Sequence, residues 1–480
     1  MQHSIITFKE LLIDNDIFRF DADYFHPKSF AFYKDIKSKR FTRIKNNFSV
    51  TKLAGFEYTK YFTFENMTTN NSYAVLTSKN IQNEELILDE SLKINKKIAD
   101  EFLNRSKLKK NDIVLSYTGE YRRALVLEED NLQLGPNICL LRAKNSNISP
   151  FYLSTFLNSE AGQLLLEREK TFSAQPTVAM SRIREIPVPL FSENFQNLIE
   201  KIVLVAKSNK KEGKSLYSQA EQLLLSELGL LNWEPKHRLS FVKKFSDTNT
   251  AGRIDAEYFQ LMYEEIVNAI KSSKSHACLG DIVSIKKCIE PGSEAYRDSG
   301  IPFLRVSNLS KFGLNSDNQQ FISEVLYDSL KAHQPKKGEI LLSKDATPGI
   351  AYYLKDAPGK MVPSGGILRV TVNDPDSVYP EYLTLVLNSA IAQKQIERDA
   401  GGSIINHWLV DQVKNTLIPI FPVLVQKKIA EKVDQSFSDR EQSKRLLDIA
   451  KRGVEMSIEK NEEEAEKWIY YELDKIGRNL

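Results

Sequence analysis

Two cysteines and a histidine lie close together in the sequence and could contribute ligands to a metal ion. Cys278 and Cys288 are ten residues apart, and His276 precedes the first of them. A structural zinc site, however, normally takes its four ligands from two pairs of closely spaced residues. With Cys139 the chain has three cysteines, too few for a disulfide framework. We therefore expect free thiols and no bound metal.

One histidine could take part in acid–base chemistry. His407 lies four residues before Asp411, a spacing that would bring the two side chains together on one face of a helix. The same stretch is equally typical of a helix start, with Ser403 or Asn406 as the capping residue. We expect the structural role for this stretch.

Cofactor-binding motifs are missing from the sequence. No two glycines have a single residue between them, so the Gly-x-Gly of a nucleotide or S-adenosylmethionine loop is absent, and so is the spacing of a P-loop. A Pro-Pro dipeptide, which amino-methyltransferases place next to a flipped base, does not occur. The only Pro-Asp, at 375–376, has no Glu-x-Lys in the 30 residues that follow it. We therefore predict no catalytic residues and no cofactor in this chain.

The composition is that of a multidomain globular protein. The 480 residues carry a net charge of +3, too near neutrality to identify a polyanionic partner, and 41% of them are hydrophobic. At about 150 residues per domain, roughly three units are expected. The longest aliphatic run, residues 202–206, is far shorter than the roughly 20 residues of a membrane span. An N-terminus without signal-peptide features completes the prediction of a cytoplasmic protein that does not enter membranes.

Several segments of the N-terminal half recur in the C-terminal half in the same order. The pattern Arg-x-Asp-Ala-acidic-Tyr-Phe of residues 19–25 returns at 253–259, and all matches keep offsets between 227 and 234 positions. Because the matches lie on one diagonal, we predict an internal duplication. The matched segments are 18–25 and 252–259, 75–81 and 303–309, 109–116 and 336–343, 150–159 and 380–389, and 186–199 and 418–429.

Each copy is predicted to contain a globule and a long helix. The globules, residues 1–191 and 233–421, mix short β-branched runs with turn signals, which predicts a mixed α+β fold for both. Between them, apolar residues recur at alternating spacings of four and three in 192–232, which predicts a helix with a heptad seam that ends at Gly229. A second helix with a weaker seam is expected from about Val425 to Tyr470, within the C-terminal part 422–480.

The two helices can be explained in two ways. Each could pack only on its own globule. Alternatively, the two could pack against each other as an antiparallel coiled coil, which would bury both seams and give the chain internal pseudo-twofold symmetry. The duplication favours the second explanation, in which the helices act as a spacer between two binding globules.

Two similar globules on a spacer suit a ligand with two separated sites, of which double-stranded DNA is the common example. Four lysines in the first helix, from Lys207 to Lys214, follow i, i+3, i+4 and i+7 spacing and could meet phosphates, or they could form an ordinary solvated face. The candidate DNA-binding residues are Lys60, Lys79, Lys109, Lys110, Arg122, Arg123, Lys207, Lys210, Lys211, Lys214, Arg305, Ser307, Asn308, Lys336, Lys337, Lys344 and Arg369.

The sequence resembles the specificity (S) subunits of type I restriction-modification systems over essentially its whole length. The resemblance lies in the order globule, helix, globule, helix, and in three sets of segments. These are Ile186-Pro187-Val188-Pro189-Leu190 with Gln196 and Ile199, the helical stretch 216–230, and the strand-like stretches 301–309 and 337–343. The first globule departs from the pattern, because Lys110-Asn111-Asp112 lacks the glycine of Lys337-Gly338-Glu339 and Tyr73-Ala74 replaces Ile301-Pro302.

The resemblance implies two target-recognition domains, each recognising one half of a bipartite asymmetric DNA site, with the paired helices setting the gap. It also implies partners: two modification subunits, which bring S-adenosylmethionine and methylate adenine, and restriction subunits, which use ATP and Mg²⁺. Catalysis would belong to those subunits. The residues alone leave two alternatives open: a duplicated scaffold that binds two copies of a protein without recognising DNA, and a fused enzyme with a hidden active site.

Overall fold

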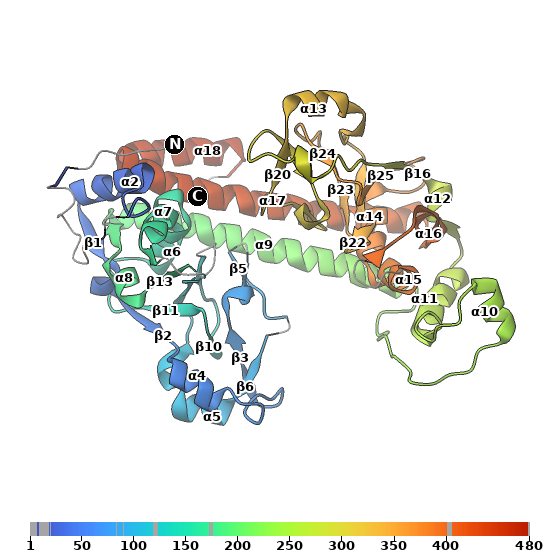
Figure 1. The fold of residues 1–480 in the computed structure, drawn as a ribbon, viewed down its shortest axis with the longest axis horizontal. Helices are drawn as coiled ribbons and strands as arrows, with labels where there is room; N and C mark the ends of the chain where they lie inside the picture. Colours follow the sequence, from blue (N-terminus) through green and yellow to red (C-terminus); the bar gives the residue numbers. More distant parts are fainter. Residues whose placement is uncertain are drawn as a thin grey trace. The chain divides into compact units, whose positions relative to one another are not determined.

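The computed structural model describes residues 7–8, 19, 21–82, 84–89, 91–118, 123–171, 176–400 and 406–478. The chain divides into two compact units, Met1–Asn209 with Glu441–Leu480, and Lys210–Arg440. Each unit holds one α+β globule together with parts of both long helices (Figure 1). The division of the chain at residues 191, 232 and 421 stays a prediction.

A four-stranded antiparallel sheet with the order β2-β11-β8-β9 forms the centre of the first unit. Both of its faces are buried: Ile113 and Leu115 of β8 join a hydrophobic cluster with α6 and α7, whereas Val114 joins a second cluster on the opposite face. This explains why β8 is a continuous apolar run without polar alternation. The strands are β2 (Phe48–Lys52), β8 (Ile113–Ser116), β9 (Ala124–Val126) and β11 (Ile138–Ala143).

A mixed sheet with the order β6-β3-β10-β7 packs beside it in the same unit. Its β3 and β10 are parallel, and the other pairs are antiparallel. Helix α5 covers one side, where Ala99 and Leu103 cluster with Val75 and Ile94. The elements are α4 (Gly55–Tyr61), β3 (Ser72–Leu76), β6 (Lys93–Asn95), α5 (Lys96–Phe102), β7 (Lys107–Leu108) and β10 (Leu132–Leu134).

The remaining short elements of the first unit frame these two sheets. A two-stranded ribbon pairs Phe41 of β1 with Pro189 of β14. The helices are α2 (Pro27–Ser38), α3 (Ile44–Asn47), α6 (Pro150–Asn158), α7 (Glu160–Arg168) and α8 (Met180–Glu185). The strands are β1 (Phe41–Arg43), β4 (Ile81–Gln82), β5 (Glu85–Leu86), β12 (Lys170–Thr171), β13 (Thr177–Val178) and β14 (Pro187–Pro189).

The second unit repeats this plan. Its antiparallel sheet has the order β16-β25-β21-β23, and its mixed sheet has three strands in the order β20-β17-β24, with β17 and β24 parallel. A ribbon pairs His276 of β15 with Pro419 of β27. The strands are β15 (His276–Cys278), β16 (Val283–Lys287), β17 (Ile301–Leu304), β18 (Leu309–Ser310), β19 (Gly313–Leu314), β20 (Gln320–Ile322), β21 (Ile340–Ser343), β22 (Asp345–Ala346), β23 (Ala351–Tyr353), β24 (Val362–Pro363), β25 (Ile367–Val372), β26 (Asn406–His407) and β27 (Leu417–Pro419).

The helices of the second unit correspond to those of the first, element by element. Helices α11, α12, α14, α15 and α16 take the places of α2, α3, α6, α7 and α8, and α13 takes the place of α5. They are α11 (Leu261–Ser272), α12 (Leu279–Ile282), α13 (Glu324–Ser329), α14 (Pro380–Asn388), α15 (Ala390–Asp399) and α16 (Val410–Asn415), and α10 (Phe245–Ala251) precedes them. The predicted α+β duplication is confirmed.

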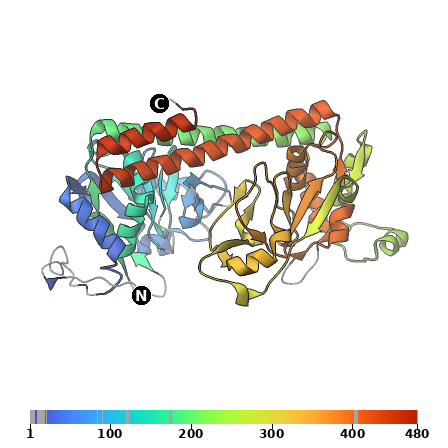
Figure 2. The ribbon, with the colours of Figure 1, turned by 90° about the horizontal axis from the view of Figure 1, so that it is seen from above.

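The long helices α9 (Glu193–Glu227) and α17 (Val423–Glu459) run antiparallel and side by side (Figures 1 and 2). In the second unit Lys432 Nζ donates to Gln219 Oε1 at 2.8 Å, and a Cβ atom on Gly213 would lie 2.9 Å from the carbonyl oxygen of Ser436. In the first unit Asn209 Nδ2 contacts Gln442 Oε1 at 3.5 Å. Gly213 is therefore a point of close helix approach, and the predicted packing of the two helices is confirmed.

The second long helix ends earlier than its apolar stripe predicts. It stops at Glu459, and Asn461 accepts a hydrogen bond from the N–H of Glu464 at 2.9 Å to cap a separate helix, α18 (Glu462–Lys475). Helix α18 folds back onto α17, where Ile469 Cδ1 lies 2.5 Å from the position a Cβ would take on Gly453. The continuous helix to Tyr470 was therefore a wrong prediction, because Asn461 caps and Gly453 provides the space for a return.

The first long helix ends as predicted. Gly229 adopts φ +69°, and the N–H of Leu230 donates to the carbonyl of Leu225 at 2.8 Å, which closes the helix end. Among the described residues, no helix is both long and apolar enough to cross a membrane.

Candidate DNA interface

The turn before strand β8 carries two of the predicted lysines. The buried carboxylate of Asp112 accepts from the N–H of Lys109 at 2.7 Å and from Arg142 Nε and Nη2 at 2.8 and 2.6 Å. Asn111 in this turn adopts φ +68°, a conformation that asparagine tolerates better than most residues. The side chains of Lys109 and Lys110 are exposed. Two cations on a turn fixed by the Asp112–Arg142 ion pair suit contacts with phosphates.

The second unit builds the same turn before β21. Glu339 accepts from the N–H of Lys336 at 2.9 Å and from Arg369 Nε and Nη2 at 2.8 Å each. Burial raises the pKa of Glu339, but the hydrogen bonds from Arg369 and Lys336 outweigh it and hold the pKa below its usual value. Gly338 takes the left-handed position with φ +87°, and Lys336 and Lys337 are exposed. Arg369, only 2% exposed, positions the turn from inside.

A second pair of equivalent turns lies after β3 and β17. Asn80 accepts from the N–H of Thr77 at 2.8 Å and donates to the carbonyl of Ile87 at 2.8 Å. Asn308 does the same with the N–H of Arg305 at 3.2 Å and the carbonyl of Asp317 at 2.9 Å. Asn308 is fully buried, so its amide holds the turn together.

The residues exposed at the tips of these turns are Lys79 in the first unit and Ser307 in the second. They occupy equivalent positions, each one residue before the buried asparagine. Because one is a cation and the other a neutral hydroxyl, the same turn can offer different contacts to two different ligand surfaces.

The four lysines predicted on the first long helix have different surroundings. Lys207 Nζ donates to the carbonyl of Val126 at 2.9 Å and pairs with Glu128 at 2.8 Å, so it ties α9 to its own globule. Lys211 and Lys214 are exposed and Lys210 is half-buried. The structure therefore does not place all four on one solvent-facing stripe.

The other candidates also differ in exposure. Lys60 on α4 is exposed and lies 5.1 Å from the ring centre of Tyr61. Arg123 Nη1 contacts the carbonyl of Ile81 at 3.4 Å, Arg305 bonds the carbonyl of Asn318, and Lys344 pairs with Asp345. Arg122 lies outside the described residues.

Sequence reasoning missed an aromatic surface in the first unit. Phe56 is 71% exposed and Phe64 96%, and Tyr58 and Phe102 are also exposed. The signal was the density of aromatic residues in 56–64, Phe-Glu-Tyr-Thr-Lys-Tyr-Phe-Thr-Phe. Exposed aromatic groups of this kind are typical of binding surfaces.

The residues considered for acid–base chemistry do not meet. His407 lies on β26 with Nδ1 2.8 Å from Asp345 Oδ1, whereas Asp411 is 92% exposed and lies 3.8 Å from Lys414. Asn406 is not a helix cap, because it lies in β26 and α16 begins only at Val410; Ser403 lies outside the described residues.

The cysteines are free in the part of the chain that the structure describes. Burial raises the pKa of both Cys139 and Cys288 to about 12, which makes them unreactive thiols. Cys278 and His276 lie together on β15. The described residues contain no group of three or more His, Cys, Asp or Glu side chains that could hold a metal ion.

A comparison with solved structures found similar chains, two of which are S subunits. The S subunit of a type I restriction-modification system from M. genitalium shares 16% identity, with a TM-score of 0.42, over 87% of this chain and 94% of that chain. The HsdS subunit from Thermoanaerobacter tengcongensis shares 13% identity, with a TM-score of 0.29, over 88% and 97%. A search of curated protein sequences found no match.

One family model matches part of the sequence. It is described as the type I restriction modification DNA specificity domain and matches residues 273–449, which include both sheets of the second unit. The resemblance to specificity subunits is thereby confirmed for residues 273–449, which match the model of the type I restriction modification DNA specificity domain.

Proposed function

We propose that the chain is the DNA-recognition subunit of a type I restriction-modification complex and that each unit binds one half of a bipartite, asymmetric site. The family match lies in 273–449. The observation that supports extending the proposal to the first unit is that its hydrogen-bond framework repeats that of the second unit, residue by residue.

Three buried contacts illustrate this repetition. Tyr152 donates its hydroxyl to the carbonyl of Pro189 at 2.9 Å, and Tyr382 donates to that of Pro419 at 2.7 Å. In the same way Asn158 donates to the carbonyl of Ala124, as Asn388 does to that of Ala351. Gln196 donates to the carbonyl of Phe191, as Gln426 does to that of Phe421. Since polar contacts in a core are costly to misplace, their repetition supports a common binding architecture.

In this proposal the turns with exposed lysines contact phosphates and thereby set the register, while loop residues such as Lys79 and Ser307 contact base edges in the major groove. The paired helices set the gap between the half-sites. Modification subunits supply S-adenosylmethionine and flip the target adenine, restriction subunits supply ATP-driven cleavage, and this chain selects the position at which they act.

Mapping methylated adenines across the genome, with and without this gene, tests the proposal. We expect a bipartite motif that disappears with the gene. Binding of the chain with its modification subunits to a duplex carrying that motif should weaken steeply between 50 and 200 mM salt, because bound phosphates release counterions. An unchanged methylation map, with salt-independent binding of protein partners alone, would instead establish the duplicated scaffold.

A further inference from the structure

A histidine–aspartate pair on the surface of the second unit lies next to one of the turns proposed to contact DNA. His407 Nδ1 lies 2.8 Å from Asp345 Oδ1, where β26 pairs with β22. A Cβ atom on Gly366 would lie 3.5 Å from Asp345 Oδ2 and 3.0 Å from Cγ2 of Val306, the first residue of the turn that carries Ser307. The pair and the turn therefore belong to one region of the surface.

The aspartate determines the tautomer of the imidazole. An ionised carboxylate can only accept hydrogen bonds, so Nδ1 of His407 carries the hydrogen and Nε2 is an acceptor in the neutral ring. The His407 side chain is 56% exposed, and Nε2 has no hydrogen-bond partner among the described residues. Asp345 also pairs with Lys344, which balances its charge. Because the three side chains together offer an acceptor without net charge, they suit a base edge better than a phosphate.

The backbone that carries Asp345 is strained and enclosed by hydrogen bonds. Ala346 has φ +62°, a left-handed conformation that alanine adopts rarely. The N–H of Thr347 donates to the carbonyl of Asp345 at 2.7 Å, and the hydroxyl of Ser343 donates to the carbonyl of Thr347 at 2.6 Å. Backbone strain is concentrated at binding and active sites, where it holds a functional group in place. The carboxylate that orients His407 is thus itself fixed.

The first unit has the same backbone arrangement in this region but different side chains. The N–H of Lys344 donates to the carbonyl of Gly366 at 2.8 Å, as the N–H of Tyr117 does to that of Asn137 at 3.3 Å. The four equivalent positions carry Lys344, Asp345, Gly366 and His407 in the second unit and Tyr117, Thr118, Asn137 and Thr177 in the first. Since only the side chains differ, this region can make the two units select different bases.

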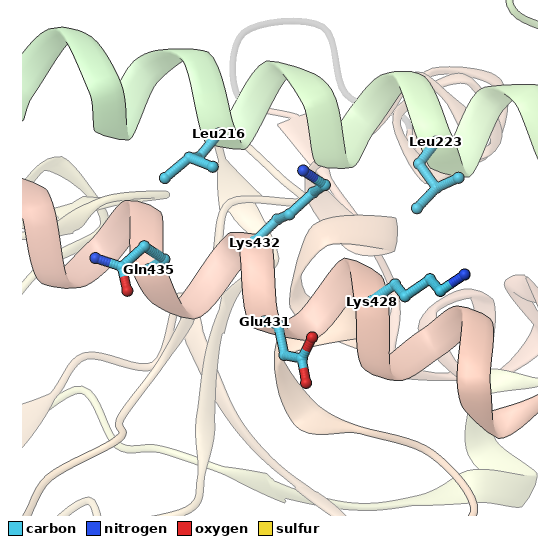
Figure 3. A pocket seen from close by; sticks show the side chains of 6 residues that line it. All are labelled: Leu216, Leu223, Lys428, Glu431, Lys432 and Gln435. Atoms are coloured by element: carbon cyan, nitrogen blue, oxygen red, sulfur yellow. The ribbon is translucent and has the colours of Figure 1, made fainter.

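The pair shares no residue with the hollow on the long helices. Figure 3 shows a pocket between α9 and α17 in the same unit, lined by Leu216, Leu223, Lys428, Glu431, Lys432 and Gln435. None of these residues belongs to the histidine–aspartate pair or to the hydrogen bonds around it. Substitutions of His407 or Asp345 therefore leave this pocket unchanged, and a change in the recognised sequence can be assigned to the globule.

We propose that His407 is a specificity-determining residue of the second unit, whose Nε2 accepts a hydrogen bond from the exocyclic amino group of adenine or cytosine in the major groove. Asp345 is its positioning residue. The inference rests on the proposed function, because it names one base contact of that DNA site. Guanine and thymine present an acceptor in place of the amino group, so two acceptors would face each other and binding would weaken.

Binding of the chain, in complex with its modification subunits, to a set of duplexes tests this contact. Each position of the methylated motif is replaced in turn by the other three base pairs. We expect one position, in one half-site, at which adenine or cytosine on one strand is preferred by about tenfold. His407→Ala should abolish this preference and leave the other half-site unchanged. Asn406→Ala, an exposed change one residue away on β26, is the control and should leave the whole pattern unchanged.

Asp345→Asn tests the tautomer with the same duplexes. An asparagine can either accept a hydrogen bond from Nδ1 of His407 or donate one to it, so both tautomers of the ring can form and Nε2 can become a donor. We expect the position that His407 recognises to admit guanine or thymine, whose acceptors pair with a donor. Recognition of the other half-site should stay as in the wild type.

Three results would overturn the inference. A pattern that His407→Ala leaves unchanged would show that this side chain contacts no base. Equal weakening for all duplexes, with the salt dependence of log K reduced by about 1, would assign His407 to a phosphate. A preference that Asp345→Asn leaves intact would remove Asp345 from the orientation of the ring. A wild-type complex that recognises no motif would instead contradict the proposed function itself, so the two failures are distinguishable.

Discussion

The two mixed sheets differ far more than the two antiparallel sheets do. The antiparallel sheets share their strand order, a carboxylate–arginine pair, and an asparagine, Asn158 or Asn388, that donates to the edge strand. The mixed sheet of the first unit has four strands and the helix α4, with exposed Phe56 and Tyr58, whereas that of the second has three strands and only a short 3-10 helix, Ser293–Ala295, at the place of α4. The antiparallel sheet with its surrounding helices is therefore nearly the same in both units, and we call it the frame. The mixed sheets are the parts in which the two copies differ.

This difference suggests that, within each unit, the frame provides stability and the mixed sheet provides the binding surface. The frame is fixed by buried polar contacts that tolerate little change, and it presents turns of the same shape in both copies. The mixed sheets differ between the copies in strand number and in α4, so their surfaces can offer different contacts in the two units. We therefore expect frame substitutions to lower stability and mixed-sheet substitutions to alter binding.

The largest expected effect comes from breaking the buried ion pairs. Arg369→Ala leaves Glu339 as an unpaired buried charge and should lower the free energy of unfolding of the second unit by about 3–5 kcal/mol. Arg142 has a side chain that is 32% exposed, so Arg142→Ala should cost the first unit less, roughly 1–3 kcal/mol. Hydrogen exchange of core amides, measured in the full chain, reports each unit separately.

The control for these two substitutions is Arg445→Ala. It removes an exposed ion pair with Glu441 on α17 and should change the free energy of unfolding by less than about 1 kcal/mol. Equal losses for Arg142 and Arg369 would show that the two frames depend on their ion pairs to the same degree despite the difference in burial.

Much of the frame could be predicted from the sequence, because duplication makes local signals appear twice. The Pro-Val-Pro stretch and the heptad seam located the ribbon and helix α9, and Gly229 located the helix end. The limits of the second helix could not be predicted, since the apolar stripe of α17 continues in phase through Asn461 into α18. The chain turns back there because Asn461 caps α18 and Ile469 packs at Gly453.

The candidate site was predictable in type but not in detail. Basic residues on turns could be identified from composition and spacing, and Lys109, Lys110, Lys336 and Lys337 are exposed. Arg369 and Asn308 could not be separated from them, because burial depends on which strand or turn faces the core. The aromatic surface of α4 has no counterpart in the repeat, so comparing the copies gave no signal for it.

Removing the equivalent lysine pairs tests whether the frame presents both turns to DNA in the same way. Lys109→Ser with Lys110→Ser, and Lys336→Ser with Lys337→Ser, should each weaken DNA binding and reduce the salt dependence of log K by about 2, because each lysine accounts for one phosphate contact. Lys271→Ser, on the exposed last turn of α11, is the control and should leave the slope unchanged. A loss for only one pair would mean that the two units contact their half-sites differently.

The smallest expected effect concerns the residue at which the two turns differ. Gly338 has φ +87° with no atom within 4 Å of the position that a Cβ would take, so only backbone strain opposes a side chain there. Gly338→Ala should lower the stability of the second unit by about 1 kcal/mol, and Gly338→Asn by less, because asparagine tolerates the left-handed region. The reciprocal Asn111→Gly should be nearly neutral, since Asn111 already adopts φ +68°. Hydrogen exchange measures all three, and a cost for asparagine equal to that for alanine would show that the two turns are not interchangeable.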